Sequence, residues 1–120
     1  MSTSVESIKE NILRIVQERG PVTFADINNH VEGFKSNEET TSWIRNPHGK
    51  NMYAWIGMTE NGAEAIKQLI KEYVVILNSC PMVNYLCDGT IPAIPVASED
   101  KDYAEPHWSP MEIAIYTPNN

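Results

Sequence analysis

Apolar residues at three- and four-residue steps mark the start of the chain as an amphipathic helix. The residues with this spacing are Val5, Ile8, Ile12, Ile15 and Val16. Because such spacing places side chains on one face of a helix, the pattern predicts a helix over residues 4–19. Thr3 and Glu6 have the spacing of a capping box at its start, and Gly20 followed by Pro21 supplies a stop.

A second helix is predicted after a short extended connector at residues 21–23. Thr23 and Asp26 again have capping-box spacing, which places the helix start at this point. Gly33 is expected to end the helix. The expected core face consists of Phe24, Ile27 and Val31.

A third helix is predicted over residues 37–45, because Ser36 and Glu39 repeat the capping spacing. Its large apolar residues are Trp43 and Ile44. Most of the surface of this helix is therefore expected to be solvated or bound to a partner.

The middle of the chain predicts a strand followed by another helix. Residues 51–58 alternate with the two-residue period of a strand, and Thr59 can cap a helix over residues 60–73. The residues expected to face inward from this helix are Ala63, Ile66, Leu69, Ile70 and Tyr73.

The last third of the chain is predicted to be rich in β structure. Residues 74–77 and 82–87 favour strands, and the Asp88-Gly89 pair is typical of a hairpin turn. The returning limb contains Pro92 and Pro95 and is therefore expected to be an edge strand or an irregular segment. The remaining expected elements are a polar loop at residues 98–106 and a last strand at residues 111–116.

The Gly20-Pro21-Val22-Thr23-Phe24-Ala25-Asp26-Ile27 segment resembles the exit of the first helix and the short strand of a winged-helix domain. With the predicted elements around it, the resemblance covers residues 4–58. It implies a helix-turn-helix DNA-binding module in which residues 37–45 are the recognition helix. The chain departs from this family where the wing would follow, because one predicted strand is succeeded directly by a helix.

These elements predict an α+β fold in a single domain over residues 1–120. Residues 4–73 would form a winged-helix-like core, and residues 74–120 a β-rich extension. A chain of 120 residues has the common size of one domain. No apolar run is long enough to span a membrane, and the first ten residues lack the features of a secretory signal, so we expect a cytoplasmic protein.

The formal net charge is −7, and the excess of carboxylates is concentrated toward the C-terminus. Residues 1–79 hold eight Lys and Arg against ten Asp and Glu, whereas residues 80–120 hold one against six. Residues 41–59 contain cations and no carboxylate. This local window could engage phosphates, although the overall charge disfavours non-specific binding to nucleic acid.

The resemblance implies DNA contacts from the predicted third helix and its flanks. The candidate residues are Lys35, Asn37, Thr40, Thr41, Arg45, His48 and Lys50. Those on the helix could meet phosphates or base edges, and the flanking cations could contact the backbone. Glu38 and Glu39 oppose this interpretation, because carboxylates at the start of such a helix repel phosphate. An ordinary solvated helix and loop is the alternative.

Three aromatic residues, Trp43, Tyr53 and Trp55, lie in the same window. Aromatic residues interleaved with cations are typical of single-strand binding surfaces, where bases stack on the rings. Packing in the core and in a hairpin is the alternative, and it is favoured because the positive charge is sparse.

Catalytic and metal-binding patterns are not found, so the sequence predicts a protein that is not an enzyme and needs no cofactor. There is no phosphate-binding glycine loop, and the three histidines are scattered with no paired ligand. His107 beside the acidic loop could act as an acid or base, but such loops are normally solvated. Cys80 and Cys87 are expected to be reduced, partly buried thiols.

The acidic last third supports a second class of function, an interaction or inhibitory protein that binds a basic protein surface without contacting DNA. The size and charge would suit a product of a phage or mobile element. Carboxylates spread over one face would favour this hypothesis, whereas carboxylates confined to one loop would leave the basic window free for DNA. The helix predicted over residues 60–73 and the β-rich extension offer apolar surface for a homodimer, for which two-fold symmetry is the default.

Overall fold

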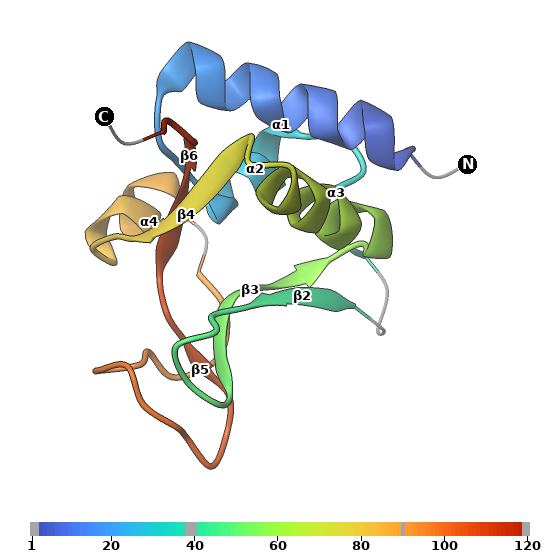
Figure 1. Cartoon of the computed structure of the whole chain (residues 1–120). Helices are drawn as coiled ribbons and strands as arrows, with labels where there is room; N and C mark the ends of the chain where they lie inside the picture. The colour runs from blue at the N-terminus through green and yellow to red at the C-terminus, as the bar shows by residue number, and fades with distance from the viewer. Residues whose placement is uncertain (1–2, 38–40, 90, 119–120) are drawn as a thin grey trace.

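The computed structural model describes residues 3–37, 41–89 and 91–118 (Figure 1). Its elements in chain order are α1 (Val5–Arg19), β1 (Val22–Thr23), α2 (Phe24–His30), β2 (Ser42–Arg45), β3 (Met52–Met58), α3 (Glu60–Lys71), β4 (Val75–Ser79), α4 (Val83–Asp88), β5 (His107–Trp108) and β6 (Met111–Ile115). The predicted α+β class is confirmed. None of the helices in the described part is long and apolar enough to cross a membrane.

The strands form two small three-stranded sheets. In the first sheet β6 lies between β1 and β4 and pairs antiparallel with both. In the second sheet β3 lies between β2, which is antiparallel to it, and β5, which is parallel. The last third of the chain therefore completes sheets that the first half begins.

Helix α3 lies between α1 and the β2–β3 hairpin, as Figure 1 shows. Its apolar face, with Ala63, Ala65, Ile66 and Leu69, is buried in the same hydrophobic cluster as the inner face of α1. Helix α3 begins at its predicted position, since Thr59 Oγ1 accepts a hydrogen bond from the Gly62 N–H. The cap of α1 is Ser4 rather than Thr3. Tyr73, expected to face inward, is 72% exposed.

The prediction of a helix over residues 37–45 is wrong for the part of this segment that the structure describes. Ser42–Arg45 form β2, and all residues of β2 have partners in β3. Trp43 and Ile44 favour extended structure, and the longer strand β3 beside them can form ladder hydrogen bonds with their backbone. Residues 38–40, which include the candidate Thr40, lie outside the described residues. The β2–β3 pair also supplies the two-stranded hairpin that the sequence had not predicted.

Prediction of a β-hairpin around Asp88-Gly89 is also wrong. Residues 82–87 lie almost wholly within α4, and Gly89, at φ 77°, is the left-handed residue that ends this helix. An Asp-Gly pair occurs both in hairpin turns and at the C-termini of helices, because each of these structures needs a residue that tolerates positive φ. In the segment that was predicted to return from the hairpin turn, Val96 forms an isolated β-bridge with Trp108.

An aromatic cluster explains why the chain forms α4 at this point. Tyr85 is fully buried, and its ring packs at 4.7 Å and 89° against Trp108 and stacks on Trp55. Its hydroxyl donates to the Met111 carbonyl at 2.6 Å and accepts from the Phe24 N–H at 3.1 Å. One side chain thereby links α4 to α2 and to the central strand β6.

Candidate functional site

The structure places three of the described DNA-contact candidates in the β2–β3 hairpin rather than on a helix. Arg45 is exposed on β2, and His48 and Lys50 are exposed in the turn that joins the two strands. Thr41 lies just before β2 and is half-buried. Arg45, His48 and Lys50 therefore come together at the turn end of the hairpin.

The other two candidates lie away from this turn. Lys35 forms an isolated bridge with Met58, at the opposite end of β3. Asn37 is exposed in the segment that follows. The predicted set of residues is therefore divided between the two ends of the hairpin, and only the turn end gathers positive charge.

The turn is held in place by the loop at residues 97–106. The Lys50 N–H donates to Asp102 Oδ1 at 2.8 Å, and the Tyr103 N–H donates to the Lys50 carbonyl at 3.0 Å. The Lys101 carbonyl approaches Gly49 so closely that a Cβ at this glycine would lie 2.1 Å from the oxygen. Asn46, which is buried, donates to Ser109 Oγ at 2.9 Å. The turn is thus positioned by contacts with the loop at residues 97–106 and with Ser109.

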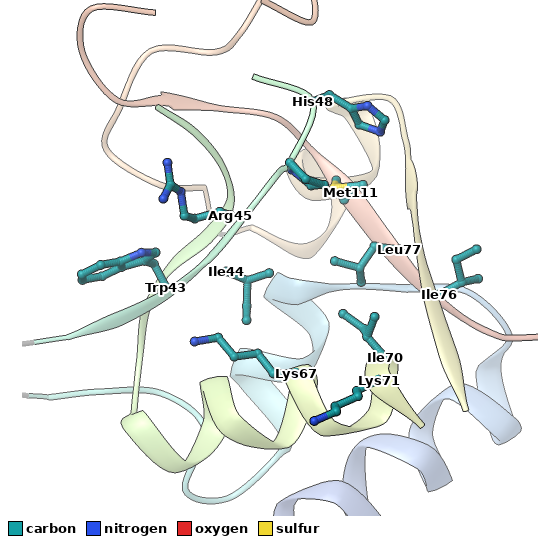
Figure 2. Close-up of a pocket in the computed structure, with 11 residues that line it drawn as sticks. Trp43, Ile44, Arg45, His48, Lys67, Ile70, Lys71, Ile76, Leu77 and Met111 are labelled. Carbon is teal, nitrogen blue, oxygen red and sulfur yellow. The ribbon is translucent and has the colours of Figure 1, made fainter. Parts of the chain in front are cut away.

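A pocket of about 550 Å³ lies between β2, the turn, α3 and β4. Figure 2 shows Ile44, Ile70 and Leu77 converging on this space from three different elements. The complete lining is Trp43, Ile44, Arg45, Pro47, His48, Lys67, Ile70, Lys71, Ile76, Leu77 and Met111. We call this pocket the β2–α3 groove.

Four cationic or ionisable basic side chains border the β2–α3 groove, and none of its lining residues is a carboxylate. Arg45 and His48 come from the hairpin, whereas Lys67 and Lys71 come from the exposed face of α3. Sequence reasoning missed the two lysines. Their four-residue spacing was a visible signal that they share a helix face, but their approach to β2 depends on tertiary packing.

The cations of the β2–α3 groove differ in their pairing from Lys9 and Arg19, which form ion pairs. Lys9 lies 3.0 Å from Glu72 Oε1, and Arg19 lies 2.7 Å from Asp26 Oδ1. Arg45, Lys67 and Lys71 make no ion pair with any residue that the structure describes. Their positive charge therefore remains available to an anion.

The three aromatic residues of the basic window have different environments. Trp55 is buried and stacks on Phe24, as expected for the core. Trp43 is 49% exposed on β2, so it is not a core residue. Its ring lies 6.4 Å from Tyr53 at 85°, and both line a second pocket of about 240 Å³. Trp43 thus separates this smaller pocket from the β2–α3 groove.

Negative charge in the last third of the chain is gathered mainly in one loop. Glu99, Asp100, Asp102 and Glu105 all lie exposed in residues 97–106. His107, which follows this loop, donates from Nδ1 to the Glu105 carbonyl at 2.8 Å and stacks on Tyr103. No cluster of three potential metal ligands is found among residues 3–37, 41–89 and 91–118. The charge distribution therefore leaves the β2–α3 groove basic.

The two cysteines differ in exposure, and only Cys80 matches the expected partly buried state. Cys80 is half-buried at the end of β4, and Cys87 is exposed on α4. Burial, together with the nearby Glu112 carboxylate, raises the pKa of the Cys80 thiol to about 11. A thiol with this pKa is almost wholly protonated, and so weakly nucleophilic, at neutral pH.

We therefore expect iodoacetamide at pH 8 to alkylate Cys87 at least about tenfold faster than Cys80, because the thiolate is the reacting species. Peptide mass spectrometry over time measures both rates in one sample. The Cys80 rate should rise steeply as the pH increases from 8 toward 11. Equal rates at pH 8 would contradict the assigned burial of Cys80.

Comparison of the chain with protein-family models, curated proteins and solved structures gave no match.

Proposed function

We propose that this chain is a small DNA-binding or regulatory protein that contacts phosphates through the β2–β3 hairpin and α3. The observation that carries the proposal is that Arg45, Lys67 and Lys71 border one groove and form no ion pair with the part of the chain that the structure describes. Lys50 and His48 lie exposed in the turn at the tip of the hairpin, where Asp102 Oδ1 accepts from the Lys50 N–H. Cations in this arrangement favour the binding of a polyanion.

The order of elements supports a winged-helix-like interpretation of the first half. Helix α1, the short strand β1 and helix α2 follow one another as in that family, and the β2–β3 hairpin would take the place of the wing, although β2 lies where the family has its third helix. With β2 where the recognition helix was expected, the contacts would come from a hairpin and from the exposed lysines of α3. Such contacts to phosphates provide affinity and position rather than sequence specificity.

The proposal predicts binding to duplex DNA that weakens steeply with salt. Fluorescence anisotropy with a labelled duplex and a labelled single strand, at several salt concentrations, measures the dependence. Four phosphate contacts correspond to a slope of log K against log salt of about −3.6, and Arg45→Ala with Lys50→Ala should reduce its magnitude by about 1.8. Lys67→Ala with Lys71→Ala should have a similar effect.

A control is Arg14→Ala, which removes a positive charge on α1, outside the groove and the turn. It should leave the slope near that of the wild type, because Arg14 contacts Asn11 on α1. Absence of binding at low salt, or a loss per removed charge as large in the control as in the two double variants, would contradict the proposal.

An acidic interaction surface is the second candidate function, favoured by the four exposed carboxylates of residues 97–106. This loop would present negative charge to a basic protein partner. A chain that failed to bind DNA, and whose partner was lost on replacing Glu99, Asp100 and Glu105 with glutamine, would fit this second function instead.

A further inference from the structure

The β2–α3 groove combines an apolar floor with a cationic border, and this combination suits a ligand smaller than a nucleic acid. Ile44, Ile70, Leu77 and Met111 form the floor, and Trp43 and Ile76 close its sides (Figure 2). Trp43 is 49% and Ile76 39% exposed, and a DNA backbone that reached the border would leave this apolar surface in contact with water. An apolar ligand body would cover this surface and gain free energy by removing it from water.

The size of the groove agrees with this interpretation. Its volume of about 550 Å³ lies within the range of roughly 300–1,000 Å³ that is typical of small-molecule sites. Such sites are lined mostly by hydrophobic and aromatic side chains, with a few polar groups that orient the ligand. The β2–α3 groove has this composition, because its polar groups come from only four residues.

The charge of those polar groups defines the part of the ligand that faces them. Lys67 and Lys71 are neighbours on one face of α3, where like charges repel each other. The carboxylates closest to them along the helix are engaged elsewhere, since Glu64 accepts from Gln68 and Glu72 pairs with Lys9. A bound anion would offset the repulsion between the two lysines. Arg45 lies across the groove on β2 and carries the same charge.

We propose that the β2–α3 groove binds a small amphipathic organic anion, with the apolar body against Ile44, Ile70 and Leu77 and the anionic head between Lys67, Lys71 and Arg45. This inference goes beyond the proposed DNA binding and does not depend on it. A fatty-acid carboxylate or an aromatic sulfonate has the required chemistry, an apolar body and one negative head.

The test uses 8-anilinonaphthalene-1-sulfonate as the probe, with no DNA present. The full-length protein should give saturable probe fluorescence, and decanoate should displace the probe. Lys67→Gln with Lys71→Gln should weaken probe binding about tenfold, since two partly exposed ion pairs are lost. Lys35→Gln with Lys101→Gln removes the same charge outside the groove and should leave the affinity within about twofold of the wild type.

An uncharged probe of the same shape separates the two parts of the site. N-phenyl-1-naphthylamine lacks the sulfonate, so its affinity should be equal in the wild type and in the Lys67→Gln, Lys71→Gln variant. Matching thermal unfolding curves would show that this variant keeps the fold of the wild type. Absence of saturable binding, or the same loss of affinity in the variant and its control, would overturn the proposal.

Discussion

Replacing Trp108 with alanine is expected to lower the free energy of unfolding by about 3–5 kcal/mol, the usual cost of removing a fully buried large aromatic side chain. Trp108 is completely buried, packs against Tyr85 and Trp55, and donates from Nε1 to the Ala54 carbonyl at 3.2 Å. Removing it would open a cavity where β5 meets β3. Chemical denaturation followed by circular dichroism measures the change.

Trp43→Ala is the matched control, because it makes the same chemical change at a tryptophan that is 49% exposed. It should cost less than about 1.5 kcal/mol, since a half-exposed side chain contributes correspondingly less apolar burial. Equal losses from the two alanine variants would mean that the aromatic cluster is not the centre of the core.

Tyr85→Phe is expected to cost about 2–4 kcal/mol, although it removes a single oxygen atom. The Tyr85 hydroxyl accepts from the Phe24 N–H and donates to the Met111 carbonyl, and all three residues are buried. Without the hydroxyl, two buried backbone groups lose this partner, and each such loss costs about 1–3 kcal/mol. The same denaturation measurement determines the change.

Tyr73→Phe provides the comparison for this oxygen deletion, because Tyr73 is 72% exposed. Its hydroxyl can hydrogen-bond to water, so the free energy of unfolding should stay within about 0.5 kcal/mol of the wild type. If Tyr85→Phe were equally neutral, α4 would not be held to α2 and β6 by this side chain.

The elements that were predicted correctly are those specified by local signals. Helix α1 combines a strong helical period with a capping residue and a following Gly-Pro, and α3 follows directly on the capping residue Thr59. Strand β3 shows the alternation expected of extended structure over most of its length. In these segments the periodicity and the caps agree on one structure.

The elements that were predicted wrongly depend on partners distant in sequence. Strand β2 forms because β3 is beside it, and four residues carry too little periodicity to identify a strand alone. The short apolar segment that forms α4 is equally compatible with a strand when its sequence is considered alone. The helix allows the Tyr85 hydroxyl to hydrogen-bond to Phe24 and Met111. Neither the pairing of β2 with β3 nor the contacts of Tyr85 can be predicted from the local sequence.

Part of the proposed site comes from the sequence alone. The carboxylate-free window of residues 41–59 contains Arg45, His48 and Lys50. Lys67 and Lys71 were not included, because α3 was interpreted from its apolar face alone. The apolar floor of the groove joins β2, α3 and β4, so no single segment of the sequence contains it.

If the side of the molecule formed by β2, the turn and α3 binds DNA, the amides on that side should respond to a bound duplex. Titration of ¹⁵N-labelled protein with a short duplex at low salt, followed by amide chemical shifts, maps the binding surface directly. We expect the largest shifts at residues 42–50 and in the last turns of α3. Shifts concentrated in residues 97–106 or on α1, or no shifts at all, would contradict this account.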